Sequence, residues 1–248
     1  MTEPSAATPP LLDVRGLTRR YGDFAAVSNL SFQVSAGEIV GFLGPNGAGK
    51  STTMRMLTTY LPPTEGTATV CGADIVEDAA RVREQIGYLP ETPPVYPEMR
   101  VERYLRFVAR IRQVPRGQIG ERVNWAIEAC GLADRRRQII GTLSKGYRQR
   151  VGIAQAIVHD PRVLILDEPT SGLDPNQILE IRDLIRRLGE GRTILLSTHI
   201  LQEVRSVCDR VLILHNGHLA FDAPLDDSLD LEKTFIDLTT RVTESEAA

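Results

Sequence analysis

Apolar residues are spaced in two different ways along this chain. Short continuous apolar runs, such as 39–43 and 163–166, are typical of buried strands. Between residues 101 and 158 the apolar positions instead recur every three or four residues, which is the spacing of amphipathic helices. The pattern therefore predicts a strand-rich α/β core that is interrupted by a helical insertion.

The remaining elements follow from the same reasoning. Alternating apolar and polar residues over 11–34 predict an antiparallel sheet that precedes the core. Four prolines within 90–97 predict a stiff connector that leads into the insertion. Further strands are expected at 66–71, 86–89, 193–197, 211–214 and 219–221, and further helices at 78–85, 175–188 and 229–238.

The length of the chain limits how these elements are organised. With 248 residues, 42% of them hydrophobic, the chain can form one sizeable core with a satellite subdomain. We expect a single domain over 11–240, with the helical subdomain inserted at about 91–158. Residues 1–10 are rich in Pro, Ala and Thr and are expected to be disordered, and 241–248 are expected to form a polar tail.

Charge and cysteine content exclude several classes of function. The net charge of −3 gives no overall positive field, so nucleic acid is not expected as a partner. No apolar run approaches the roughly 20 residues of a membrane helix, so any membrane-spanning work needs another chain. Cys71, Cys130 and Cys208 lie far apart, which favours reduced thiols in a cytosolic protein over a disulfide or a metal site.

The most specific motif in the chain is Gly44-Pro45-Asn46-Gly47-Ala48-Gly49-Lys50-Ser51-Thr52, which fits the phosphate-binding pattern G-x-x-x-x-G-K-[ST]. It lies between a predicted strand and a predicted helix, where backbone N–H groups and the helix N-terminus can face a polyphosphate. Lys50 would reach the β- and γ-phosphates, and Ser51 would bind Mg²⁺. The chain has 26 Arg and only 3 Lys, so a lysine at this position favours a compact cation inside a closed loop.

Three further polar residues follow buried strands, at the edge where open α/β sheets bind ligands. Asp167 and Glu168 come directly after 163–166. We expect Asp167 to hold Mg²⁺ and Glu168 to face a water that attacks the γ-phosphate, although one such carboxylate could also be a helix cap. His199 follows 193–197 and is expected near the γ-phosphate, unless it is a structural histidine.

Taken together, these residues resemble the nucleotide-binding domain of ATP-binding cassette (ABC) transporters. Residues 143–150, Leu-Ser-Lys-Gly-Tyr-Arg-Gln-Arg, are similar to the signature sequence of that family, and 171–174 are similar to the loop that links the two sites of a dimer. The phosphate loop, the acidic strand end and His199 also match. The resemblance implies an α/β fold with a P-loop NTPase core, a mixed, largely parallel sheet, an N-terminal antiparallel β-subdomain and an inserted helical subdomain.

The resemblance also implies a site that two chains share. Two such domains pack head to tail and trap two ATP molecules, each between the phosphate loop of one chain and the signature of the other. Tyr21, otherwise a candidate packing residue, would stack on adenine. Ser144 and Gly146 would bind the γ-phosphate in trans, and Asp174 would belong to the linking loop.

The chemistry that the resemblance implies is ATP hydrolysis. Glu168 would act as general base for water, while Lys50 and His199 would hold the γ-phosphate and the transition state. ATP and Mg²⁺ are the cofactors, and Ser51, Asp167 and Glu91 are the candidate metal ligands. Glu91 is a departure, because the family usually has Gln at this position.

The signature contains the other departure, since Lys145 and Tyr147 stand where Gly and Gln are commoner. We hypothesise that Lys145 adds a cation near the trapped phosphate. Both departures are similar to a branch whose ATP-binding domains are separate chains that serve exporter-type permeases, including gliding-motility and antibiotic-efflux systems. Residues 231–235 are similar to the C-terminal end of that branch.

We therefore expect the ATP-hydrolysing subunit of an exporter. It would dimerise on ATP binding, as a homodimer, and drive a separate integral-membrane permease as a peripheral protein on the cytoplasmic face of the inner membrane. The alternative is a soluble ABC-type ATPase that acts on ribosomes or DNA without a permease. A phosphate-loop kinase for a small metabolite would leave the signature and the Glu168–His199 pairing without a role.

Overall fold

The computed structural model describes residues 9–226 and 228–240. It contains a four-stranded sheet in the order β2-β1-β4-β5, in which neighbouring strands are antiparallel. The strands of this first sheet are β1 (Leu12–Tyr21), β2 (Phe24–Val34), β4 (Glu65–Val70) and β5 (Ala73–Asp74). The antiparallel sheet predicted over 11–34 is therefore confirmed, and the strand predicted at 66–71 pairs with it.

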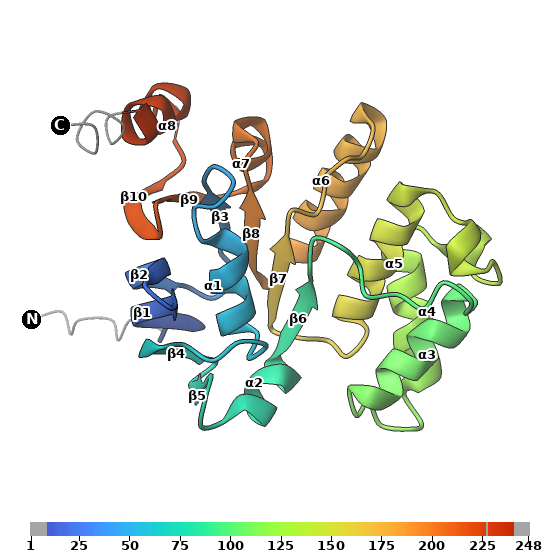
Figure 1. Ribbon diagram of the computed structural model, residues 1–248. Helices are drawn as coiled ribbons and strands as arrows, with labels where there is room; N and C mark the ends of the chain where they lie inside the picture. The colour runs from blue at the N-terminus through green and yellow to red at the C-terminus, as the bar shows by residue number, and fades with distance from the viewer. Residues whose placement is uncertain (1–8, 227, 241–248) are drawn as a thin grey trace, which may run out of the picture.

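The second sheet forms the centre of the molecule, with the order β10-β9-β3-β8-β7-β6 (Figure 1). Its strands are β3 (Ile39–Leu43), β6 (Ile86–Leu89), β7 (Val163–Asp167), β8 (Thr193–Thr198), β9 (Arg210–His215) and β10 (His218–Pro224). Five of them run parallel, and β10 joins the edge antiparallel to β9. The parallel strands are continuous apolar runs because helices or strands cover both of their faces.

Alternate residues of the central strands pack into two different cores. Val163 and Ile165 face α1 (Lys50–Leu57) and the first sheet, whereas Leu164 and Leu166 face α6 (Pro175–Gly189) and the helical insertion. This alternation follows from the two-residue period of a strand. The short helices α2 (Ala79–Gln85) and α7 (Leu201–Val207), and the terminal helix α8 (Leu231–Thr240), complete the cover.

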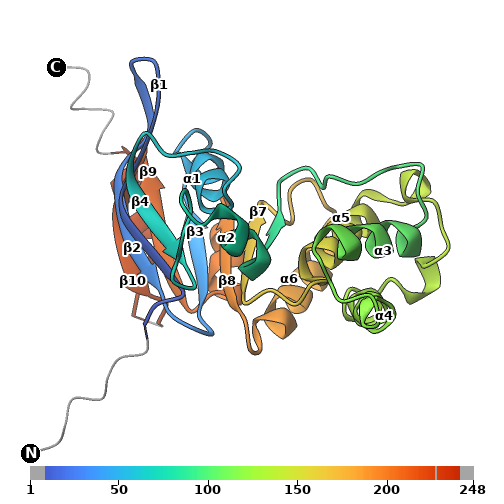
Figure 2. The ribbon, with the colours of Figure 1, turned by 90° about the horizontal axis from the view of Figure 1, so that it is seen from below.

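The insertion forms a lobe on the opposite side of the central sheet from the first sheet (Figure 2). Its helices are α3 (Val101–Ile111), α4 (Ile119–Ala129) and α5 (Lys145–Ile157), with 3₁₀ turns at Ala133–Arg135 and Ile140–Thr142. The apolar positions that predicted these helices all pack into one core, including Leu105, Ile127 and Ala154. The proline-rich connector at 90–97 contains no helix or strand.

The helix α7 was not predicted from the sequence, and the other α-helices and the termini differ from expectation only at their edges. The last helix was expected at 229–238 but begins at Leu231 and ends at Thr240. The disorder predicted for residues 1–10 falls mainly on 1–8, which lie outside the described residues, as does the predicted tail at 241–248. The three cysteines are free thiols. Within the described residues no helix is long and apolar enough to cross a membrane.

Candidate functional site

The phosphate loop connects β3 to α1 and is closely packed against the first sheet. Gly49 has φ +101°, and a Cβ atom at this position would lie 2.6 Å from the carbonyl oxygen of Ala26. Only glycine fits there without strain. Nζ of Lys50 turns back into the loop, where it donates to the carbonyl oxygens of Gly44 at 2.7 Å and Pro45 at 3.1 Å.

A turn from the far end of the chain supports this loop. The backbone N–H of Gly217, between β9 and β10, donates to the carbonyl of Ala48 at 3.2 Å. The carbonyl of Gly217 in turn accepts from the N–H of Ser28 at 2.8 Å. The β9–β10 hairpin therefore joins the first sheet to the phosphate loop.

An open cavity of about 540 Å³, which we call the phosphate cavity, lies in front of the phosphate loop. Its walls come from the β1–β2 turn, the phosphate loop, the start of the connector and the carboxyl ends of β7 and β8. The lining residues are Tyr21, Phe24, Ala26, Asn46, Gly47, Ala48, Gly49, Lys50, Ser51, Thr52, Glu91, Glu168, Ser171 and His199. Most residues that were predicted to bind nucleotide are thus gathered in one place.

Glu168 joins two other polar residues of this cavity. Its Oε1 lies 3.5 Å from Nζ of Lys50, and its Oε2 lies 2.8 Å from Nδ1 of His199. The residue is only 8% exposed and has φ +50°. A non-glycine residue in this left-handed region is strained and persists only where its surroundings hold it, as is common at functional sites.

Asp167 lies beside Glu168 but faces the start of α1. Its Oδ1 accepts from the hydroxyls of Ser51 at 3.1 Å and Ser197 at 2.5 Å. Ser197 also accepts from the backbone N–H of Glu168 at 3.1 Å, so it links the two acidic residues.

The oxygen atoms at this position suit a magnesium ion. Ser51 and Asp167 offer a hydroxyl and a carboxylate that are already in contact, and Glu91 lines the same cavity. Mg²⁺ prefers oxygen ligands and is commonly held by one or two carboxylates together with phosphates and water. The described residues contain no group of three or more His, Cys, Asp or Glu side chains suited to a metal, and such binding requires none.

The signature residues lie elsewhere, at the beginning of α5. Ser144 caps this helix by accepting from the N–H of Tyr147, and Asp174 caps α6 by accepting from the N–H of Gln177 at 3.0 Å. Gly146 packs against α6, because a Cβ atom on it would lie 2.6 Å from the side chain of Gln177. Ser144, Gly146 and Asp174 therefore do not line the cavity of their own chain.

The sequence pattern missed two residues of the cavity and its support. Phe24 lines the cavity with 65% of its surface exposed, next to Tyr21, which is 49% exposed. The guanidinium of Arg19 lies over the ring of Tyr21, 4.8 Å from its centroid, so one face of that ring is occupied. A second aromatic residue three positions after Tyr21 was the feature of the sequence that could have identified Phe24. No comparable signal marked Ser197, since its role depends on contacts between strands.

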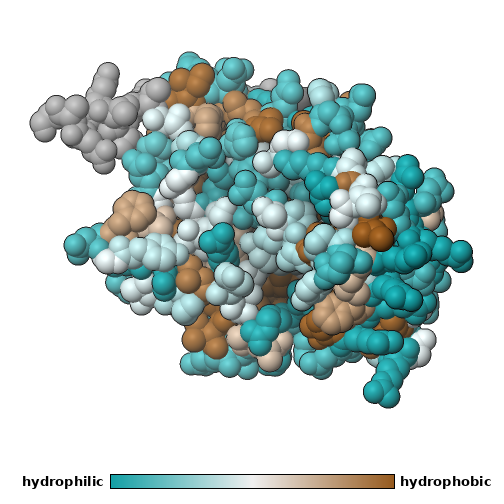
Figure 3. Space-filling model, turned by 45° about the vertical axis from the view of Figure 1, so that its right-hand side comes forward, coloured by the Kyte–Doolittle hydropathy of each residue, from teal (hydrophilic) through white to brown (hydrophobic). Residues whose placement is uncertain are grey.

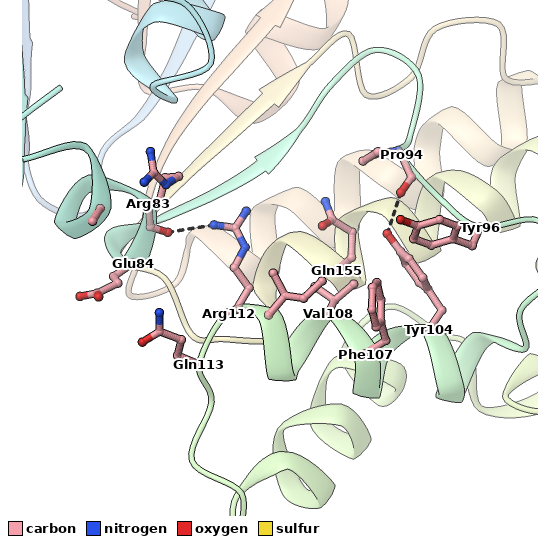
Figure 4. Close-up of a pocket in the computed structure, with 12 residues that line it drawn as sticks. Arg83, Glu84, Pro94, Tyr96, Tyr104, Phe107, Val108, Arg112, Gln113 and Gln155 are labelled. Atoms are coloured by element: carbon pink, nitrogen blue, oxygen red, sulfur yellow. Dashed lines mark hydrogen bonds between the residues drawn. The ribbon is translucent and has the colours of Figure 1, made fainter. Parts of the chain in front are cut away.

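A second cavity, of about 420 Å³, lies between α2, the connector and the helices α3 and α5 of the lobe (Figure 4). We call it the aromatic cleft. The rings of Tyr96 and Phe107 meet edge to face at 5.7 Å, and the hydroxyl of Tyr104 donates to the carbonyl of Pro94 at 2.9 Å. The cleft is lined by Ala80, Arg83, Glu84, Pro94, Tyr96, Tyr104, Phe107, Val108, Ile111, Arg112, Gln113 and Gln155.

The proline-rich connector links the aromatic cleft to the first cavity. The connector at 90–97 lines the phosphate cavity with Glu91 and lines the cleft with Pro94 and Tyr96. The space-filling view of this side shows separate hydrophobic patches among largely hydrophilic residues, including patches over the lobe (Figure 3). Phe107 and Ile111 are 38% and 60% exposed.

Comparison with known proteins gives consistent matches. The family model for ABC transporters matches residues 27–171. An uncharacterized ABC transporter ATP-binding protein, YxlF of Bacillus subtilis, is 38% identical over 224 residues, which is 90% of this chain and 74% of that protein. The Nod factor export ATP-binding protein I of Ralstonia nicotianae is 38% identical over 215 residues, covering 86% of this chain and 67% of that protein.

Solved structures show the same fold. The structure of an ATP-binding subunit of an ABC transporter superposes with a TM-score of 0.83 at 32% identity, covering 92% of this chain and 99% of that chain. A dimeric, post-hydrolysis structure of the ATP-binding cassette MJ0796 with ADP and Pi has a TM-score of 0.78 at 22% identity, covering 87% and 99%. The predicted α/β architecture with its antiparallel sheet and inserted helices is therefore confirmed.

Proposed function

This chain belongs to the ABC transporter family and is an ATPase, and we propose that it powers an exporter by closing on ATP as a homodimer beneath a separate membrane-spanning permease. The Ralstonia relative is named as an export ATP-binding protein, which supports the direction of transport. We place the protein at the cytoplasmic face of the inner membrane, as a peripheral subunit.

The observation that carries this proposal is the position of Glu168. Its carboxylate is held between Lys50 and His199 at the mouth of the phosphate loop. A carboxylate that is 8% exposed and turned toward the place of the γ-phosphate is well placed to accept a proton from water. The same edge of the sheet supplies cationic and neutral donors for the phosphoryl group.

We assign the steps of hydrolysis to these side chains. Glu168 takes a proton from a water molecule whose oxygen attacks the γ-phosphorus, and the bond to the bridging oxygen breaks to release ADP and phosphate. Lys50 exchanges the carbonyls of Gly44 and Pro45 for phosphate oxygens when ATP enters. His199 and Lys50 stabilise the charge of the transferring phosphoryl group.

Mg²⁺ would be held by Ser51 and Asp167, with Glu91 as a further candidate on the same cavity wall. When bound, the ion neutralises phosphate charge and orients the β- and γ-phosphates. Within the chain itself, Ser197 fixes the orientation of Asp167 through the hydrogen bond of 2.5 Å.

The head-to-tail homodimer is supported by the division of the site into two groups. Ser144 and Gly146 lie at the N-terminus of α5, outside the cavity that contains Lys50. A helix N-terminus favours an anion, so this end of α5 can complete the site of a second copy. Asp174, in the neighbouring loop, would lie between the two ATP molecules.

The permease is proposed to bind at the aromatic cleft. The cleft combines exposed rings, Tyr96 and Phe107, with the guanidinium of Arg112, which donates to the carbonyl of Arg83 at 2.9 Å. Such mixed aromatic and Arg surfaces are typical of protein interfaces. Because the connector joins this cleft to Glu91, movement of a bound partner would be transmitted to the phosphate cavity.

The experiment that tests the proposal is the oligomeric state of the Glu168→Gln variant by light scattering, with and without ATP and Mg²⁺. Removing the base should leave ATP bound and stall the closed state, so we expect a monomer without ATP and a dimer with it. Glu121→Gln, at an exposed position of α4, is the matched control and should hydrolyse ATP and return to the monomer. A Glu168→Gln variant that binds ATP but stays monomeric would remove the support for a site shared by two copies.

A further inference from the structure

A buried carboxylate outside the cavity touches the loop that carries Glu168 and the strand end that precedes His199. Glu203, on α7, is 1% exposed. Its Oε1 accepts a short hydrogen bond from the hydroxyl of Thr170, and its Oε2 accepts from the hydroxyl of Thr198 at 2.7 Å. Thr170 comes two residues after Glu168, and Thr198 directly precedes His199.

Two hydroxyl groups and one guanidinium surround the carboxylate of Glu203. A buried carboxylate is costly unless hydrogen bonds or a cation compensate for the lost water. Here two hydroxyls donate to it, and Nη2 of Arg182 lies 3.8 Å from Oε1. The oxygen of Thr198 also accepts from the N–H of Ile200 at 3.0 Å, which leaves its proton for the carboxylate. Glu203 therefore fixes the orientation of both threonine hydroxyls.

The loop after β7 needs such support because of its backbone conformation. Glu168 has φ +50°, and the turn that follows is closed by a hydrogen bond of 3.1 Å from the N–H of Ser171 to the carbonyl of Glu168. Thr170 lies inside this turn and is 3% exposed. A strained residue keeps its conformation only when neighbouring contacts hold it, and the bond from Thr170 to Glu203 is one such contact.

We propose that Glu203 is a positioning residue for ATP hydrolysis. It ties the loop after β7 to Thr198, the last residue of β8, and so sets the hydrogen bond of 2.8 Å between Glu168 and His199. The inference rests on the roles proposed above for Glu168 and His199. Glu203 itself does not line the phosphate cavity.

The test compares the full-length chain with Glu203→Ala and Glu203→Gln. We expect Glu203→Ala to lower kcat for ATP about 10- to 100-fold while KM changes less than about threefold, because a misplaced base slows the chemical step more than it weakens binding. Glu203→Gln retains the shape of the side chain, and its amide oxygen can accept a hydrogen bond from one of the two hydroxyls. It should therefore have a higher kcat than Glu203→Ala. Gln202→Ala, at the exposed neighbouring position, is the matched control.

A second pair of variants separates positioning from general stability. Thr198→Ser keeps the hydroxyl, whereas Thr198→Val keeps the shape without it. We expect kcat to be retained by the serine variant and lowered by the valine variant, and we expect Thr198→Val to add little to the defect of Glu203→Ala. Thr198→Val also serves as the test if Glu203→Ala does not fold.

The outcomes of these measurements are distinct. The inference is overturned if folded Glu203→Ala, or Thr198→Val in its place, has the kcat of the unmodified chain, or if kcat and KM deteriorate together in proportion to a lower Tm. Glu168→Gln is measured in parallel. If that variant hydrolyses ATP normally, the proposed role of Glu168 fails and the premise is lost, which differs from a normal kcat in Glu203→Ala while Glu168→Gln is inactive.

Discussion

Lys145 and Gly172 occupy complementary space at the surface where the signature meets the loop at 171–174. A Cβ atom on Gly172 would lie 2.2 Å from Nζ of Lys145, and Gly172 has φ +64°. The unusual lysine of the signature thus rests on the one residue type that leaves room for its ammonium group. Within the described residues Lys145 has no ion-pair partner, so in the proposed dimer its charge would be available to a phosphate of the ATP that the second copy binds.

We predict that Lys145→Ala weakens ATP-induced dimerisation of the Glu168→Gln variant about fivefold. An exposed charge interaction contributes on the order of 1 kcal/mol, which corresponds to this factor. The measurement is the ATP concentration that gives half of the dimer in light scattering. An unchanged concentration would reject the hypothesis that Lys145 adds a cation at the trapped phosphate.

Gly172→Ala should also impair dimerisation, because the new methyl group displaces Lys145. The defect should be smaller when Lys145 is already alanine, and a double-mutant cycle measures this difference. Purely additive effects would indicate that the close approach of the two residues has no consequence for closure.

The phosphate loop should tolerate no other residue at position 50. We predict that Lys50→Ala lowers ATP turnover at least about 100-fold, and that Lys50→Arg restores little, because the planar guanidinium does not fit the carbonyls of Gly44 and Pro45. ATP hydrolysis at saturating ATP is the measurement, with Lys233→Ala on α8 as the control. An active Lys50→Arg variant would mean that charge alone is sufficient.

Two aromatic residues are candidates for contact with adenine, and Phe24 is the more exposed of them. Base stacking on an aromatic ring is worth about 1–3 kcal/mol, so Phe24→Ala should raise KM for ATP about tenfold. Tyr21→Ala should raise KM as well, and the larger of the two increases in KM identifies the ring that makes the main contact with adenine. Tyr60→Ala removes another exposed ring that does not line this cavity and should leave KM unchanged.

Stability should fall in mild acid because of His159. Burial, followed by the positive charge of Arg112, lowers the pKa of His159 to about 4, below the 6.5 of an unfolded chain. Folding therefore favours the neutral ring. The stabilisation is fully present above about pH 6.5 and is lost as pH falls toward 4, by up to about 3 kcal/mol.

The test is the difference in Tm between pH 7.5 and pH 4.5 for the unmodified chain and His159→Gln. Gln cannot titrate but can still donate to the carbonyl of Ile86, which His159 contacts at 3.0 Å. We expect a smaller pH dependence in the variant. His218→Gln, at an exposed position of β10, should retain the full dependence. Equal pH dependence in all three chains would contradict the assignment.

The parts of the site that sequence predicted share a common physical cause. Lys50, Glu168 and His199 each follow a strand of one parallel sheet, and parallel strands end at the same edge. The order of strands and motifs along the chain therefore predicts that these three residues lie close together. The helical lobe could be predicted equally well from the sequence, because the spacing of its apolar residues directly indicates which of them are buried.

Other contacts depend on packing that no local pattern records. Phe24 reaches the cavity only because the first sheet lies against the phosphate loop, through the contacts of Gly217 and Gly49. Glu203 lies on a helix that the sequence pattern did not predict, and glutamate is mostly exposed in proteins, yet this residue is buried. The contact of Lys145 with Gly172 likewise joins residues 27 positions apart in the chain.

The helical lobe has a further consequence that follows from where it enters and leaves the sheet. The chain departs after β6 and returns at β7, and these two strands are direct parallel neighbours, with Leu89 opposite Leu166. In topological terms the lobe is an enlarged crossover within one β-α-β unit. Since the entropy of closing a connection grows only slowly with its length, such a crossover can lengthen, shorten or be exchanged during evolution. The nucleotide site at the edge of the sheet can in this way be combined with lobes of different size and surface.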